Sequence, residues 1–142
     1  MHALILIADG FDDLEFFYPW FRLREEGIDS TIASPPEGNV TGQHGYRVKA
    51  DLLLNQVNPN DYDLLIIPGG QSPELLRLRE EAVDIARTFM DEERTVIAIC
   101  HGPQLLISAG SLNGRQATCA PAIRDDLRVA AANYLDQAVV ID

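Results

Sequence analysis

The chain has 142 residues, 11 of them basic and 22 acidic, which gives a net charge of −11 at neutral pH. Such a charge repels phosphate backbones and anionic lipids, so nucleic acid and membrane surfaces are excluded as expected partners. The length fits one domain that buries its own core, and we expect a single domain over residues 1–142. No apolar run is long enough to cross a bilayer.

Short apolar runs alternate with helical patterns throughout the first half of the chain. Strands are predicted at the short β-branched or apolar runs, and a helix where apolar residues recur at helical spacing. The predicted elements are a strand over 3–8, a helix over 12–26 kinked at Pro19, a strand over 28–33, a small hairpin around 42–48 and a strand over 63–67.

The second half continues the same alternation. The predicted elements are a helix over 73–90 that starts near Ser72, a strand over 94–99, a helix over 103–109, a strand over 114–119, a helix over 121–134 and a strand over 138–141. Strands that alternate with helices indicate an α/β protein with a mostly parallel sheet. We expect the helices to cover both of its faces.

Cys100 lies in the sequence Ala98-Ile99-Cys100-His101-Gly102-Pro103, where a strand is predicted to end and a helix to begin. A nucleophile on such a tight turn needs small neighbours two residues away on each side, and Ala98 and Gly102 satisfy this requirement. The start of the helix predicts a thiol pKa below the ordinary value. The other interpretation is a buried structural cysteine.

The sequence Pro68-Gly69-Gly70 follows another predicted strand and should lie beside the cysteine turn, because both strands end at the same edge of the sheet. The backbone N–H groups of Gly69, Gly70 and His101 are candidates for an oxyanion hole. The loop and the turn together favour a catalytic Cys100 over a structural one.

Two acidic residues allow two interpretations each. Glu15 lies in the first turn of a predicted helix and can either reach Cys100 or complete a capping box with Asp12. Glu74 follows Gly70 closely, but an acid after Ser72-Pro73 also suits a helix start. The pattern alone assigns a catalytic role to neither of them.

Neither cofactor nor metal is expected, because three histidines and two cysteines stand at no recognised ligand spacing. Cys100 and Cys119 are expected to be free thiols in a reducing compartment. The N-terminus has no basic segment of a secretion signal, so a cytoplasmic location is predicted.

Five motifs in the same order resemble the PfpI intracellular-protease branch of the ThiJ/PfpI superfamily. They are residues 98–103, residues 68–70, Glu15 ahead of Tyr18-Pro19, His44-Gly45-Tyr46 and residues 121–126. The resemblance implies a flavodoxin-like three-layer sandwich, of the kind found in class I glutamine amidotransferases. It also implies that Cys100 is the nucleophile and that Glu15 is the acid bonded to its sulfur.

In protease-like relatives the histidine pairs with an acid from a neighbouring subunit, a position that Glu74 matches here. The resemblance thus implies a homo-oligomer, a dimer or a hexamer. Two departures from the family pattern stand out. Ala120 takes the place of a common tyrosine, and the strand over 138–141 is the last element, so that the family's final strand and helix are expected to be missing.

Three functions fit these observations. The first is a cysteine hydrolase acting on peptides or amides, and the second is a cofactor-independent glyoxalase or protein deglycase acting on α-oxoaldehydes. The third is a redox-sensing stress or chaperone protein without turnover, in which Cys100 is oxidised to a sulfinic acid. A glutaminase domain is disfavoured, because no downstream His-x-Glu is found.

Overall fold

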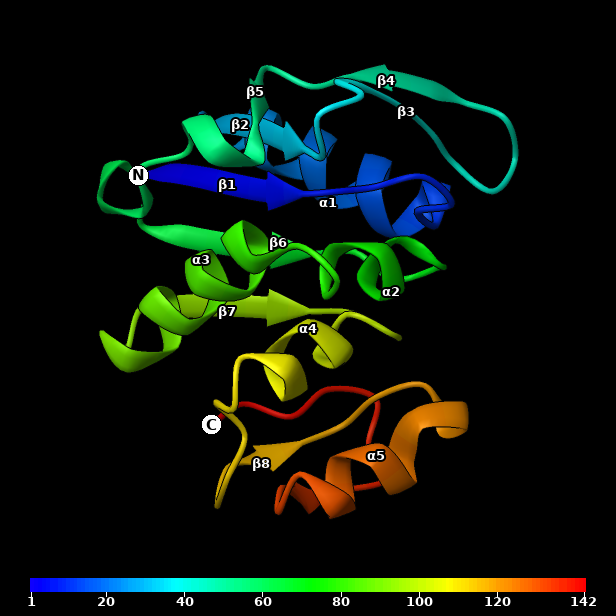
Figure 1. Cartoon of the computed structure of the whole chain (residues 1–142), viewed down its shortest axis with the longest axis vertical. Helices are drawn as coiled ribbons and strands as arrows, with labels where there is room; N and C mark the ends of the chain where they lie inside the picture. Colours follow the sequence, from blue (N-terminus) through cyan, green and yellow to red (C-terminus); the bar gives the residue numbers. More distant parts are fainter.

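A computed structural model describes all residues, Met1–Asp142. Its centre is a five-stranded parallel sheet with the strand order β5-β2-β1-β6-β7 (Figure 1). The bounds are β1 His2–Leu6, β2 Asp29–Ser34, β5 Leu52–Leu53, β6 Leu64–Ile67 and β7 Thr95–Ala98. The predicted strands over 3–8, 28–33, 63–67 and 94–99 are therefore confirmed within two residues at their ends.

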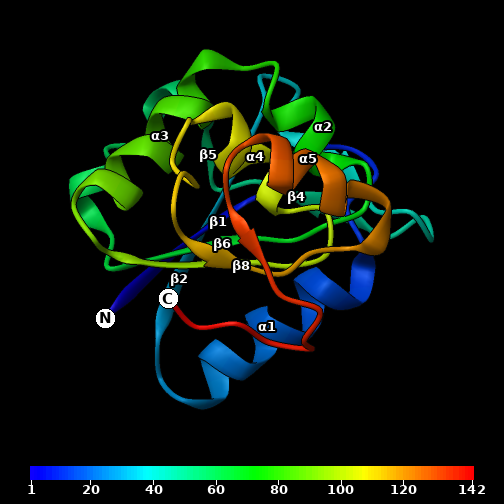
Figure 2. The same ribbon diagram turned by 90° about the horizontal axis from the view of Figure 1, so that it is seen from below.

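Helices cover both faces of this sheet, so the predicted three-layer arrangement is confirmed. Helix α1 (Asp13–Glu25) lies alone on one face, and Figure 2 shows the other four helices on the opposite side. Those four are α2 (Ser72–Leu76), α3 (Glu80–Asp91), α4 (Pro103–Ser108) and α5 (Arg124–Val129). No helix is both long and apolar enough to cross a membrane.

Each face of the sheet has its own apolar core. Along β1 the side chains alternate between the two cores: Ala3 and Ile5 belong to the core on the α1 side, and Leu4 and Leu6 to the core under the other helices. All four are fully buried. A strand that is buried on both faces has an uninterrupted apolar sequence. For this reason β1 could be recognised although apolar and polar residues do not alternate along it.

The predicted hairpin is confirmed as β3 (Asn39–Thr41) and β4 (Arg47–Lys49), an antiparallel pair. Val40 and Val48 are opposite each other and pack into the core on the α1 side. The loop between the two strands lies next to the beginning of α1 and, as described below, is bonded to it.

Several predicted boundaries were wrong. The helix over 73–90 is interrupted at residues 77–79 and forms α2 and α3. The helix over 121–134 shortens to a 3-10 turn, Pro121–Ile123, followed by α5, because Ala131 takes a positive φ of 61° and reverses the chain. The structure contains two further 3-10 turns, Leu54–Gln56 and Pro59–Asp61. Pro19 lies inside α1 without ending it.

The end of the chain differs most from the prediction. The strand over 114–119 is reduced to β8 (Gln116–Ala117), which pairs in parallel with β9 (Asn133–Tyr134) in a separate two-stranded sheet. Residues 138–141 form no strand, because their backbone pairs with no neighbouring strand. They border a groove of about 880 Å³ beside β7 instead.

Candidate active site

The candidate site lies at the point where the order of strands reverses. Strand β2 pairs with one side of β1, and β6 pairs with the other side. The loops after β1 and β6 therefore lead to helices on opposite faces of the sheet. Ligands of open α/β sheets bind at such switch points. Here the two loops are joined by hydrogen bonds from Asp12 N to Gly69 O (3.2 Å) and from Gln71 N to Gly10 O (2.8 Å).

Cys100 follows β7 directly and has a φ of +58°, a conformation that is uncommon for a residue with a side chain. Its half-buried thiol is free. The turn leaves no space around Gly102, where a Cβ would collide with the backbone of Ile67 and Ile99. The strained elbow that the sequence predicted is therefore present.

Gly69 is the point of closest approach between the two loops. A Cβ built on it would lie 2.8 Å from Cys100 Cβ and 3.0 Å from His101 N, and would also meet the Glu15 carboxyl. The absence of a side chain at this position lets four groups gather around one small volume. The sequence-predicted neighbourhood of Gly69, Cys100, His101 and Glu15 is thus correct.

The geometry decides between the two interpretations of Glu15. Asp12 does cap α1, since its side chain accepts hydrogen bonds from Leu14 N (3.0 Å) and Glu15 N (3.1 Å). The Glu15 side chain does not return to Asp12, as a capping box requires. It accepts a hydrogen bond from Gly69 N (2.7 Å) and lies beside the Cys100 thiol.

The expected low pKa of Cys100 is wrong for this structure. Burial raises the pKa of the thiol most strongly, and the charge and hydrogen bonding of Glu15 raise it further, against the opposing N–H of His101. Helix α4 has only six residues, so its dipole is too small to reverse these effects. Burial also raises the pKa of Glu15. The hydrogen bond between the two groups raises the pKa of Cys100 and lowers that of Glu15, so the shared proton is held mainly by the thiol.

His101 is the second group beside the sulfur. Its Nδ1 lies 3.3 Å from Cys100 Sγ, within reach for a proton transfer. No side chain of this chain forms a hydrogen bond or an ion pair with the other ring nitrogen. Any acid that orients His101 therefore has to come from outside the chain or from a rearrangement.

The backbone supplies hydrogen-bond donors, but not the full set that the sequence suggested. Gly69 N–H is occupied by Glu15, so it is withdrawn as an oxyanion donor. Gly70 N–H and His101 N–H donate to no carbonyl of the backbone. These two groups remain as candidates to receive negative charge from a carbonyl substrate.

Glu74 and Ala120 complete the set of predicted positions. Glu74 lies on α2 with an exposed side chain and forms no ion pair within the chain. Ala120 borders the elbow, because its N–H donates a hydrogen bond of 2.9 Å to Cys100 O. The residue at position 120 is thus placed to affect what binds next to the sulfur.

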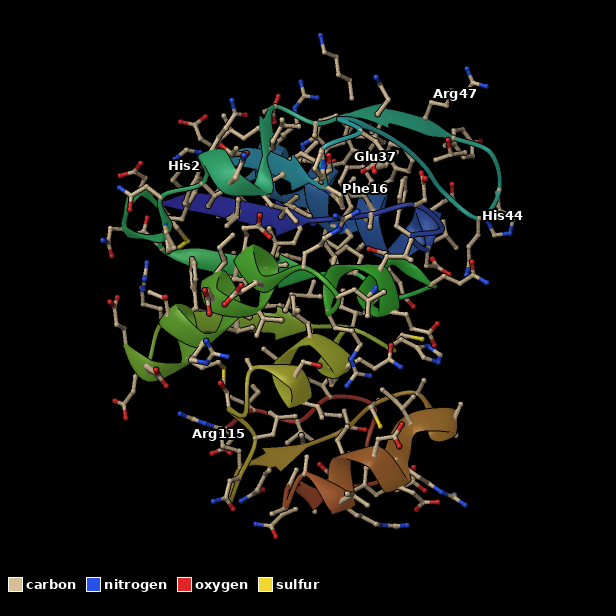
Figure 3. All side chains as sticks on the ribbon, in the orientation of Figure 1. His2, Phe16, Glu37, His44, Arg47 and Arg115 are labelled. Carbon is tan, nitrogen blue, oxygen red and sulfur yellow. The ribbon has the colours of Figure 1, made fainter.

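One contact near the site was missed. Asp13, in the first turn of α1, is buried, and its Oδ2 accepts bonds from His44 N (3.0 Å) and pairs with His44 Nδ1 (2.9 Å). Figure 3 shows His44 at the outer end of the β3–β4 loop. A Cβ at Gly42 would collide with the Asp13 carboxyl, so this glycine permits the contact. In the sequence, His44 was noted only as part of the His44-Gly45-Tyr46 motif, and nothing connected it with Asp13.

The structure has a parallel sheet and a cysteine on a strained strand-to-helix turn, next to a carboxyl group and a backbone N–H group. These features define its class as a flavodoxin-like α/β protein with a cysteine at the strand-to-helix turn. The DJ-1/PfpI family matches residues 1–142, and the chain belongs to this family. The resemblance found from the sequence motifs is thereby confirmed.

The most similar relatives and structures include three informative cases. The chain is 50% identical to Deglycase PfpI of Pyrococcus furiosus over all 142 residues, which are 86% of that protein. It is 41% identical to the putative cysteine protease YraA of Bacillus subtilis over 138 residues, 96% of this chain and 82% of that one. A two-domain protein of Anabaena variabilis with DJ-1/ThiJ/PfpI-like and ferritin-like domains gives a TM-score of 0.97 at 33% identity, over 100% of this chain and 43% of that one.

Proposed function

We propose that this protein is a cysteine-dependent hydrolase in which Cys100 attacks the carbonyl carbon of a peptide or a small amide. One observation carries the proposal: the thiol stands on a strained elbow, with its Sγ 3.3 Å from His101 Nδ1 and within hydrogen-bond reach of the backbone N–H of His101. A merely structural cysteine requires neither the strain nor such a donor.

The geometry suggests an order of events. His101 Nδ1 takes the thiol proton as Sγ bonds to the carbonyl carbon, and the oxygen, now negative, receives the N–H groups of Gly70 and His101. The proton on His101 then passes to the leaving nitrogen, which departs as an amine. Water hydrolyses the resulting thioester, and the thiol recovers its proton.

Glu15 favours a second candidate, an activity on α-oxoaldehydes or on the adducts that they form with proteins. The thiol would add to the aldehyde carbon to form a hemithioacetal, and the pKa of Glu15, raised mainly by burial, suits a group that both takes up and releases a proton. Relatives about 50% identical to this chain carry the name deglycase, which supports the same candidate.

The peptidase reading further proposes that Glu74 of a neighbouring subunit pairs with His101 in a dimer or hexamer. The support is that Glu74 is exposed on α2, beside exposed Leu75 and Leu78, while His101 has no acidic partner within its own chain. A cytoplasmic location remains part of the proposal, and the two free thiols agree with a reducing compartment.

The deciding experiment compares the protein with its Cys100→Ser variant on a fluorogenic peptide and, separately, on methylglyoxal. Peptide cleavage that disappears in the variant supports the first candidate, and loss of methylglyoxal that disappears supports the second. If neither substrate is consumed while peroxide converts Cys100 to a sulfinic acid, as read by mass spectrometry, both enzymatic proposals are overturned in favour of a redox sensor.

A further inference from the structure

A pocket of about 570 Å³ lies between the last turns of α1, the start of β2 and strand β4. Its volume is in the range of small-molecule sites. We call it the β2 pocket, and its apolar lining consists of Phe17, Trp20, Ile28, Ile32 and Val48. The candidate active site belongs to the loops after β1, β6 and β7, and none of its residues lines the β2 pocket. The pocket is therefore a separate feature of the fold.

Three of the 11 basic residues of the chain border the β2 pocket. They are Arg24 on α1 and Arg47 and Lys49 on β4, and none of them forms an ion pair within the chain. Arg47 and Lys49 are on either side of the buried Val48, so they stand at the outer rim (Figure 3). Unpaired cations that gather at one pocket of an acidic chain indicate a ligand with negative charge.

Arg24 is in contact with an aromatic ring of the same helix. Its guanidinium carbon lies 5.4 Å from the centroid of the Trp20 ring, and this ring in turn stacks on the buried Phe16 with 5.6 Å between centroids. A cation–π contact uses the flat face of the guanidinium and leaves its N–H groups free to donate to an anion. The contact also limits the positions of the Arg24 side chain before a ligand binds, which lowers the entropy cost of binding.

The backbone of β2 supplies uncharged donors to the same pocket. Ile32 N donates to Asp51 Oδ2 (2.8 Å), on the side of β2 that faces away from β1. Backbone groups two residues apart in a strand point the same way, so Ser30 N–H also faces the outer edge. Strand β5 pairs only with the last two residues of β2 and leaves this edge open. The Ser30 hydroxyl forms no hydrogen bond within the chain either.

Two carboxylates border the pocket as well. Asp51 accepts the N–H of Ile32 and thereby takes part in the connection between β2 and β5. Asp29, at the start of β2, is exposed. Three cations against two carboxylates leave one positive charge in excess at the β2 pocket, whereas the chain as a whole has a net charge of −11. This balance favours an anion over a neutral or cationic ligand.

We propose that the β2 pocket binds a small organic anion. The carboxylate or phosphate group of the ligand accepts hydrogen bonds from Arg24 and from the N–H and hydroxyl groups of Ser30. Its apolar body packs against Trp20 and Ile28. The two rim cations attract the ligand from solution. Binding at this pocket requires no reaction at Cys100, so the inference does not rest on the proposed function.

Trp20 is the only tryptophan of the chain, so its fluorescence reports on this pocket. The probes are phenyl phosphate and phenylacetate, with benzyl alcohol as the neutral analogue and inorganic phosphate as an anion without an apolar body. At least one of the two organic anions is expected to give a saturable change in emission, and both comparison probes should bind about tenfold more weakly or less. The anion that saturates identifies the charged group. No saturation with either, or equal binding of benzyl alcohol, overturns the proposal.

Variants locate the binding site. Arg24→Gln is expected to weaken binding by about tenfold or more and Ser30→Ala by about threefold. Arg115→Gln is the matched control, because Arg115 is an unpaired arginine at the other end of the molecule (Figure 3). Cys100→Ser should bind like the unchanged protein. Circular dichroism verifies folding, and isothermal titration calorimetry measures affinity without the altered Trp20 signal. Unchanged affinity in both pocket variants, or an equal loss in Arg115→Gln or Cys100→Ser, overturns the proposal.

Discussion

The carboxyl group of Glu15 reaches across from α1 to accept the N–H of Gly69, 54 residues further along the chain, at 2.7 Å. This bond fixes the carboxyl next to the Cys100 thiol and at the same time occupies a donor that would otherwise face the substrate. The pKa of the sulfur, which burial raises most strongly, is therefore raised further by a residue of the first helix.

Replacement of Glu15 by glutamine is expected to lower the pKa of Cys100, because it removes a negative charge that raises this pKa. The rate of iodoacetamide labelling at Cys100 should then rise at a lower pH than in the unchanged protein. Activity should fall by about a hundredfold or more if the acid transfers a proton. Glu81→Gln, at an exposed position of α3, is the control, and a labelling profile unchanged by Glu15→Gln would contradict the role of Glu15.

The elbow should cost stability. A residue with a side chain at a φ of +58° is strained by about 1 kcal/mol or more relative to glycine. Both Cys100→Gly and Cys100→Ala are expected to be inactive, with Cys100→Gly the more stable by roughly 1 kcal/mol in urea unfolding. Equal unfolding midpoints for the two variants would argue that the elbow is relaxed.

Gly69→Ala is expected to abolish activity, since a Cβ there would lie 2.8 Å from Cys100 Cβ and would push the two loops apart. The comparison is Gly45→Ala, where the Cβ meets nothing within 4 Å but φ is +87°. That variant should lose about 1 kcal/mol of stability and keep its activity. Gly69→Ala with near-normal kinetics would exclude the tight convergence of groups around position 69.

The pair of Asp13 and His44 predicts a pH dependence of stability. Burial raises the pKa of Asp13, but the hydrogen bonds from His44 and the backbone outweigh it, so the pKa lies below its usual value of 3.8. A carboxyl whose pKa is depressed by folding stabilises the protein above its usual pKa, and this contribution is lost as the pH falls through the folded value.

Urea unfolding at several pH values tests this dependence. Asp13→Asn should show a smaller loss of stability on acidification below pH 3.8 than the unchanged protein does. His44→Ala should cost about 1 kcal/mol at neutral pH, because it removes one hydrogen bond to a buried carboxylate. Asp29→Asn, at an exposed position of β2, serves as the control and should follow the unchanged protein.

The two central strands, β1 and β6, could be predicted because they are buried on both faces and have almost uninterrupted apolar sequences. The elbow was predictable for a different reason: Gly102 and Gly69 are required by close approaches that only glycine permits. The order of the five motifs along the chain predicted the family. The resemblance to that family in turn predicted that Glu15 lies beside the sulfur of Cys100. These signals are local in the sequence or fixed by topology, which is why they were sufficient.

Other features depend on contacts that the sequence does not reveal. Whether Glu15 returns to Asp12 or reaches Gly69 is decided by the packing of two loops, and so is the balance of charges that sets the pKa of Cys100. Asp13 and His44 are 31 residues apart and share no motif. Residues 138–141 have the composition of a strand, but a strand also needs a partner with a free edge in the correct position.

The hydrogen bond from Ala120 N to Cys100 O connects the nucleophile to residues 111–142, whose strands β8 and β9 form a sheet of their own. A local opening of residues 111–142 would break this link without breaking any strand pairing of the five-stranded sheet. Loss of activity and global unfolding are thus separable events, and heat or a protease should inactivate the protein before it melts.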